Sequence, residues 1–206
     1  MSSWTAMPPD QIVAFFIFAL VAAITPGPSN VLILAAGSRA GFVGGLRCLA
    51  GVVTGMALLM GLGSLGLAGF ADTYPQSLIT LKWLGSAFLL WLAWQIGTAP
   101  AMSDQPQAAT VGFWQALVFQ WINPKSWVVT LSAVGVYGAE VSDAGGVMSR
   151  AFQMAGVFAV AATISSTVWL AFGASMKQWL SHQRRARRFN QAMGVLLALS
   201  VALVIR

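Results

Sequence analysis

The stretch 11-QIVAFFIFALVAAITPGPSNVLILAAGS-38 contains no charged residue, and it decides which class of fold the chain can adopt. A helix needs about 20 mostly apolar residues to cross the hydrocarbon core of a bilayer. A cleavable signal peptide has a basic start and an apolar run of only roughly 7–15 residues, and this stretch has neither property. We therefore predict a membrane span that remains in the protein.

The rest of the sequence has the same character. Of its 206 residues, 58% are hydrophobic and 8% are charged, whereas soluble domains carry about 25% charged residues. Five further apolar stretches, one of them interrupted only by Lys125, follow at Cys48–Ala71, Trp83–Ser103, Phe113–Tyr137, Ala151–Met176 and Phe189–Ile205. The pattern predicts an all-α integral membrane protein with six transmembrane helices in a single membrane domain, residues 1–206.

The basic residues predict the orientation, because cytoplasmic loops of membrane proteins are enriched in Lys and Arg. The connections between spans 1 and 2, 3 and 4, and 5 and 6 share one side, which holds seven basic residues: Arg39, Arg47, Lys177, Arg184, Arg185, Arg187 and Arg188. The opposite side holds three: Lys82, Arg150 and Arg206. We therefore expect the first side to be cytoplasmic and both termini to lie outside.

Composition also argues against several classes of protein. The net charge of +6 comes largely from juxtamembrane arginines without a nucleic-acid-binding motif, so no nucleic acid partner is expected. The chain has one cysteine, Cys48, and one histidine, His182, which lies in the arginine-rich loop. It has no P-loop, dinucleotide-binding turn or nucleophile elbow. We expect no enzyme activity, no catalytic residue, no cofactor and no bound metal.

The first span is interrupted by Thr25-Pro26-Gly27-Pro28-Ser29-Asn30. Proline removes a backbone N–H and collides with the carbonyl four residues earlier, so two prolines around a glycine cannot continue a helix. We expect the span to unwind there. Unpaired backbone groups at membrane depth are tolerated only where they face protein or a water-filled cavity. These six residues are therefore candidates for a solute-binding site.

The fourth span contains a second interruption, Asn123-Pro124-Lys125, with Gln120 shortly before it. Asn as the N-cap and Pro at the first helical position are typical of a helix start. The amides of the new half-helix would then point at the centre of the membrane, where they stabilise an anion. Lys125 adds a cation at the same depth, where a charge is costly without a partner or water. These four residues join the candidate site.

The two interruptions hold the same position in each half of the chain, residues 1–104 and 105–206. Halves of three spans have opposite orientations, and matching broken helices in inverted halves are the best sequence indication of a transporter's binding site. Simpler explanations exist. Prolines are common in membrane helices, Lys125 could snorkel to an interface, and Trp121 and Trp127 could merely pack. The two breaks and the lysine together favour a binding site.

These motifs are also where the chain resembles a known family. The segment 25-TPGPSN-30 resembles the first-span signature of the LysE/RhtB amino-acid exporters, and Phe113 with 120-QWINPK-125 is similar to their fourth-span signature. The resemblance covers essentially the whole chain, and 91-WLAWQI-96 looks closest to the branch that exports cysteine and O-acetylserine. The chain differs at Ser29, where the family pattern has Asn. The resemblance implies a secondary exporter of amino acids or their derivatives in the inner membrane of a bacterium.

The favoured mechanism is alternating access. Because no ATP-binding motif is present, the expected energy source is an ion gradient, with a proton as the expected coupling ion. The substrate carboxylate would lie near Lys125 and the start of the half-helix after Asn123, and its ammonium near the freed carbonyls, Asn30 and Gln120. The expected partners are an amino-acid substrate, the ion and the lipid bilayer, and a homo-oligomer is left open. The alternatives are a metal-ion exporter, for which the spans offer only Cys48 as a ligand, a membrane-embedded enzyme, and a non-catalytic subunit of a larger complex.

Overall fold

The computed structural model describes residues 7–67, 75–98, 111–138 and 144–205, and these residues form helices without any strand. The α-helices are α1 (Pro9–Ile24), α2 (Pro28–Leu62), α4 (Pro75–Thr98), α5 (Phe113–Ile122), α6 (Pro124–Tyr137), α7 (Ala144–Ser175) and α8 (Gln183–Ile205). A π-helical turn, η1 (Gly63–Leu67), follows α2, and a 3₁₀ helix, η3 (Trp179–Ser181), precedes α8. The predicted all-α fold is confirmed.

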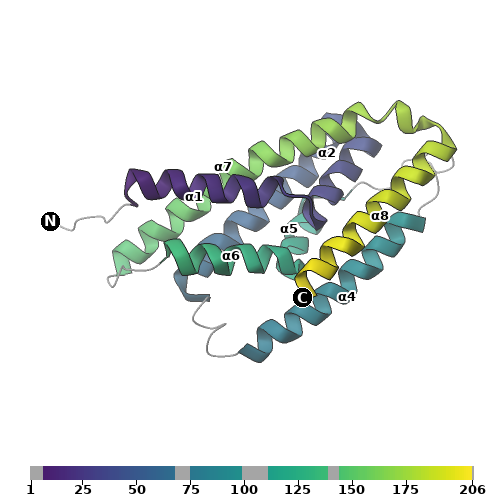
Figure 1. Ribbon diagram of the computed structural model, residues 1–206. Helices are drawn as coiled ribbons and strands as arrows, with labels where there is room; N and C mark the ends of the chain where they lie inside the picture. Colours follow the sequence, from purple (N-terminus) through teal and green to yellow (C-terminus); the bar gives the residue numbers. More distant parts are fainter. Residues whose placement is uncertain (1–6, 68–74, 99–110, 139–143, 206) are drawn as a thin grey trace.

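The helices α1 and α6 run in nearly the same direction, while α4 and α8 run together at an angle to them (Figure 1). Two segments, Pro28–Gly66 and Gly145–Ser175, are each long and apolar enough to cross a membrane, and α1 is a shorter apolar helix. The helices α5 and α6 have 10 and 14 residues, which corresponds to about 15 and 21 Å at roughly 1.5 Å per residue. Each is shorter than the roughly 30 Å hydrocarbon core. The fourth span is therefore the pair α5–α6.

The helix α2 contains the end of the first span and the start of the second. Its path reverses at Gly41, whose φ of 78° lies in the left-handed region that glycine adopts without strain. A Cβ on Gly45 would lie 3.5 Å from the backbone nitrogen of Gly37. In a straight helix these residues would be about 12 Å apart along the axis. Residues 28–40 and 42–62 are thus two arms of a helical hairpin.

Small residues let the arms of α2 pack closely against α7 and α5. A Cβ on Gly173 of α7 would collide with the carbonyl of Leu34, and one on Gly51 would collide with the carbonyl of Phe113. Small residues allow such close backbone contact between helices in membranes. Gly51, which belongs to the second span, is buried at this contact. A second pair of packed helices, α4 and α8, lies beside this centre (Figure 1).

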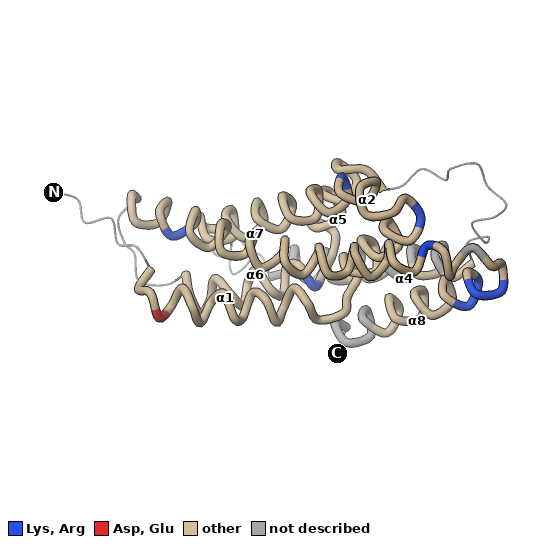
Figure 2. Tube along the Cα trace, turned by 90° about the horizontal axis from the view of Figure 1, so that it is seen from above, with Lys and Arg blue, Asp and Glu red and all other residues tan. Residues whose placement is uncertain are grey.

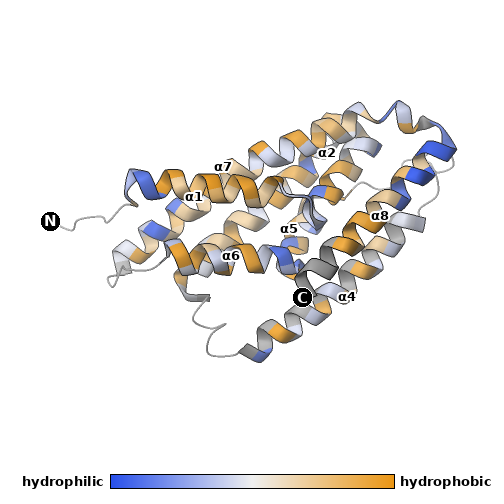
Figure 3. Ribbon diagram, viewed as in Figure 1, coloured by the Kyte–Doolittle hydropathy of each residue, from blue (hydrophilic) through white to orange (hydrophobic). Residues whose placement is uncertain are grey.

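Charge and hydropathy follow the long axis of the bundle. Lys and Arg gather mainly at the end where α8 begins, Asp10 lies in the first turn of α1, and one basic residue lies near the middle (Figure 2). Apolar residues cover most of the length between the ends (Figure 3). On α1 the apolar residues Val13, Ile17 and Val21 are more than half exposed. A stripe of this kind suits lipid contact.

Candidate functional site

The first span is broken where the two prolines predict it. The helix α1 ends at Ile24, and the Thr25 amide and hydroxyl both donate to the Val21 carbonyl, at 3.1 and 2.6 Å. Gly27 is fully extended, with φ −174° and ψ −179°. The helix resumes at Pro28, and its first backbone hydrogen bond is the one from the Val31 amide to the Gly27 carbonyl, at 3.0 Å.

The carbonyls at the end of α1 are bound by side chains of the protein itself. Both N–H bonds of Asn30 Nδ2 are used, because this atom donates to the carbonyls of Ala23 and Thr25, each at 2.9 Å. Lys125 Nζ donates to the same Thr25 carbonyl at 2.6 Å. The Trp169 indole donates to the Ile24 carbonyl at 3.3 Å. These three carbonyls are therefore already bound within the protein.

The second break lies at Asn123, as its Asn-Pro sequence predicts. The Asn123 amide donates to the Phe119 carbonyl at 3.0 Å and ends α5. Its side-chain oxygen accepts from the Lys125 amide at 3.1 Å, and its carbonyl accepts from the Ser126 amide at 3.0 Å. The expected N-cap is confirmed, and these two amides at the start of α6 are already bound.

Hydrogen bonds join the two breaks directly. Asn123 Nδ2 donates to Ser29 Oγ at 3.0 Å, and the Ser29 hydroxyl donates to Gln120 Oε1 at 2.8 Å. Gln120 Oε1 also accepts from the Ser126 hydroxyl at 3.2 Å, while Gln120 Nε2 donates to the Ala116 carbonyl at 3.1 Å. Gln120 and Asn123 are buried. The network stabilises the contact between the first and fourth spans, because each buried polar group in it has a partner.

Lys125 extends from the start of α6 toward the end of α1. Of the three protons on its ammonium, the contact with Thr25 uses one. Within the described residues the only carboxylate is Asp10, which lies in the first turn of α1 and forms no ion pair with Lys125. The ammonium therefore carries two further donors and an unpaired charge in this part of the structure.

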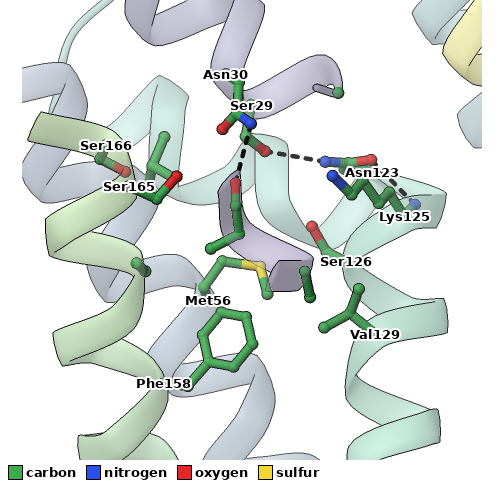
Figure 4. Close-up of a pocket in the computed structure, with 15 residues that line it drawn as sticks. Ser29, Asn30, Met56, Asn123, Lys125, Ser126, Val129, Phe158, Ser165 and Ser166 are labelled. Carbon is green, nitrogen blue, oxygen red and sulfur yellow. Dashed lines mark hydrogen bonds between the residues drawn. The ribbon is translucent and has the colours of Figure 1, made fainter. Parts of the chain in front are cut away.

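A pocket of about 430 Å³, counted with its opening, lies beside the two breaks (Figure 4). Five of the predicted site residues line it: Gly27, Ser29, Asn30, Asn123 and Lys125. The other five are close by but do not line it: Thr25, Pro26, Pro28, Gln120 and Pro124. The tryptophans beside the break do not line it either. Trp127 donates to the Trp121 carbonyl at 2.7 Å, and the two rings pack edge to face.

Residues that the sequence analysis missed complete the pocket. The helix α7 contributes Ser165 and Ser166, which are both buried, and Phe158; the second arm of α2 contributes Met56. The hydroxyl-rich run Thr163–Thr167 was a sequence signal, because polar side chains in a span usually face the bundle interior, although the run does not show which of its hydroxyls do so. Met56 and Phe158 gave no signal, since apolar residues are expected throughout a span.

Apolar side chains line the pocket on the side toward the N-terminal end of α1. Met56, Val129 and Phe158 lie together on one side of the pocket (Figure 4). Beyond them, Phe15 packs against Tyr137 with ring centroids 5.1 Å apart. A second apolar cluster packs on the other side of the pocket along the bundle, and it includes Ile33, Phe119 and Leu170. The polar network thus lies between two apolar layers.

This arrangement can bind a small polar solute by hydrogen bonds and charge. The described residues contain no group of three His, Cys, Asp or Glu side chains that could hold a metal ion. A helical membrane protein with two broken helices beside a pocket that is lined by both polar and apolar side chains has the architecture of a transporter.

The comparisons with known proteins agree with this class. Residues 20–205 match the family model of the LysE type translocators, and the chain belongs to this family. It is 30% identical over 194 residues to the cysteine/O-acetylserine efflux protein of Salmonella typhimurium, with 94% of both chains covered. It is 29% identical over 193 residues to the protein of the same name in Escherichia coli K12, again with 94% of both chains covered. No solved structure matches the chain. The predicted family is confirmed, and its members are translocators rather than enzymes.

Proposed function

We propose that the protein exports amino acids or their derivatives from the bacterial cytoplasm through the pocket between the two breaks. The observation that carries the proposal is the position of Lys125. Its ammonium lies beside the pocket without a carboxylate partner among the described residues. A charged group at membrane depth that has no protein counter-charge is suited to a charged substrate. The efflux function named for the two relatives supports the same assignment.

The substrate carboxylate has a second set of donors at the start of α2. This helix begins without a side-chain cap, and its first backbone hydrogen bond comes from Val31. The amides of Ser29 and Asn30 precede that bond, and both residues line the pocket. Amides at a helix start and the positive end of the helix dipole stabilise an anion. We therefore assign the carboxylate to the start of α2 and Lys125, whereas the sequence had favoured the start of α6.

The substrate ammonium is assigned to Asn30. Because Asn30 Nδ2 donates to two carbonyls, the orientation of the amide is fixed and Oδ1 is left as an acceptor. Asn30 lines the pocket beside Ser29 (Figure 4). A pocket with cationic donors on one side and an amide acceptor next to them matches the two charges of a zwitterionic amino acid.

The two apolar layers around the pocket support a mechanism of alternating access. Opening one layer while the other stays closed would expose the site to one side of the membrane at a time. The two three-span halves, residues 1–104 and 105–206, are the proposed moving units, since the pocket lies where their broken spans meet. An ion gradient, with a proton as the coupling ion, is the proposed energy source. The arginine-rich end is assigned to the cytoplasm and both termini to the outside.

Transport by the purified protein tests the proposal. Proteoliposomes that contain only this chain are loaded with unlabelled cysteine or O-acetylserine, and the entry of the labelled compound by exchange is measured against protein-free liposomes. We expect exchange that unlabelled amino acid inhibits and that a pH gradient converts into net transport. Exchange without an effect of the pH gradient would reject proton coupling alone. No exchange with any amino acid would reject the function and would favour a subunit of a larger complex.

A further inference from the structure

The structure contains a polar group that the proposed binding of a zwitterion does not use, the hydroxyl of Ser165. Ser165 is 1% exposed, and its Oγ has no hydrogen-bond partner. Nearly all buried polar side-chain atoms in proteins have a partner, so each exception requires an explanation. Leaving such a group unpaired opposes folding. A ligand that supplies the missing partner would remove this penalty.

A carbonyl of α7 itself could have accepted a hydrogen bond from the Ser165 hydroxyl, because other hydroxyls on this helix make such bonds. Thr163 donates to the Ala159 carbonyl and Thr167 donates to the Thr163 carbonyl, both at 2.7 Å. These two threonines lie on the exposed side of α7. Ser165, on the buried side, makes no such bond to the preceding turn. Its buried hydroxyl therefore keeps an unused donor and acceptor on the side of α7 that lines the pocket.

Ser165 lies apart from the groups that would bind the charged ends of a substrate. Figure 4 shows Ser165 and Ser166 together on α7, with Lys125 and Asn123 on the far side of the pocket and Asn30 between them. The remaining lining near Ser165 is small or apolar and includes Ala162 and Phe158. A substrate with its carboxylate at Lys125 and its ammonium at Asn30 would direct its side chain toward α7.

We propose that Ser165 forms a hydrogen bond with the side chain of the substrate. This bond would make the transporter selective for amino acids whose short side chain carries a polar group, such as a hydroxyl, thiol or ester. The inference rests on the proposed export of amino acids. The hydroxyl is both donor and acceptor, so it can pair with any of these groups. An apolar side chain of the same size leaves it unpaired. A site built to hydrogen-bond a substrate group discriminates against the analogue that lacks the group.

The test compares cysteine with 2-aminobutyrate, in which a methyl group replaces the thiol. Both are measured in the exchange assay with the wild type and with Ser165→Ala. We expect Ser165→Ala to lower exchange of cysteine about three- to tenfold, as for one neutral hydrogen bond, and to change exchange of 2-aminobutyrate less than about twofold. Serine and alanine form a second pair that differs by one hydroxyl and should give the same pattern.

Ser86→Ala is the matched control. Ser86 on α4 is also 1% exposed and also has a hydroxyl without a partner, but it does not line the pocket. We expect it to leave both substrates unaffected. Equal loss of both substrates in Ser165→Ala, or no loss of either, overturns the inference while export itself stands. A wild type that exchanges no amino acid overturns the proposed function and this inference with it.

Discussion

The side chain of Lys125 lies directly over the backbone of Gly27. A Cβ atom on Gly27 would be 2.9 Å from Lys125 Cδ and 3.0 Å from its Nζ. Any larger residue at position 27 would therefore occupy the space that the lysine uses to reach the Thr25 carbonyl. The first break supplies this space and the second break supplies the lysine, so neither motif forms the cationic side of the pocket without the other.

Substitution of Gly27 by alanine tests this relationship. Its backbone is extended, so alanine can adopt the same conformation, and the effect should come from displacement of Lys125. We expect Gly27→Ala to lower amino-acid exchange about tenfold, the loss of one charge-assisted contact, with unchanged helix content by circular dichroism. Gly135→Ala on α6 is the control, because a Cβ there meets nothing within 4 Å. If Gly27→Ala exchanged amino acids as fast as the wild type, the position of the Lys125 side chain over Gly27 would be unimportant for transport.

Lys125 itself should determine substrate binding rather than folding. We expect Lys125→Ala and Lys125→Gln to insert normally but to lose at least about tenfold in substrate affinity, because a hydrogen bond to a charged group contributes about 1.5–3 kcal/mol. Lys125→Arg should restore only part of the activity, since a planar guanidinium has a different shape and hydrogen-bond geometry. The measurement is exchange at several substrate concentrations, with insertion checked by protease protection. Normal exchange by Lys125→Ala would move the site to the first break alone.

Gln120 should affect stability more than recognition, because it does not line the pocket. Its Oε1 accepts from both Ser29 and Ser126, and Gln120→Leu would leave two hydroxyls without this acceptor. We expect a destabilisation of about 2–4 kcal/mol from two unpaired groups, visible as a lower Tm in detergent. Ser175→Ala removes an exposed hydroxyl bonded to Phe172 and should leave the Tm unchanged. An unaltered Tm for Gln120→Leu would contradict the stabilising role of the network.

The orientation in the membrane gives a further prediction. The basic residues predict that the loop around Arg184–Arg188 is cytoplasmic and that both termini are outside. A fluorescent protein that matures only in the cytoplasm should be bright when inserted in this loop and dark when fused to the C-terminus. Alkaline phosphatase, which is active only outside the cytoplasm, should give the opposite result. A bright C-terminal fusion would reverse the assignment and with it the direction of each half.

The fold and the two breaks could be predicted because their physical causes are local. Proline at 26, 28 and 124 cannot donate a helical hydrogen bond in any surroundings. A stretch without charges can be predicted to span the membrane from its own residues alone. The contact between Ser29 and Asn123 could not be predicted in this way. It joins residues far apart in the sequence, and nothing in either motif specifies the pairing.

Two features of the site required the structure. The sequence suggested that the freed carbonyls of α1 would meet the substrate, but the side chains of Asn30, Lys125 and Trp169 bind three of them. Such contacts depend on how α6 and α7 pack against α1. The sequence also could not distinguish Ser165 from the threonines around it, because the difference lies in which side of α7 faces the pocket.

The hairpin of α2 has a mechanical consequence. Only Gly41 interrupts the helix between residues 28–40, which begin at the first break, and residues 42–62, which carry Met56 into the pocket. The two arms are in close contact near Gly37 and Gly45, so they cannot slide independently. A tilt of the first arm, caused by a solute at Ser29 and Asn30, would turn the second arm through the same pivot and shift Met56. Under the proposed function, one glycine would thereby couple a solute at Ser29 and Asn30 to the apolar side chains beside the pocket.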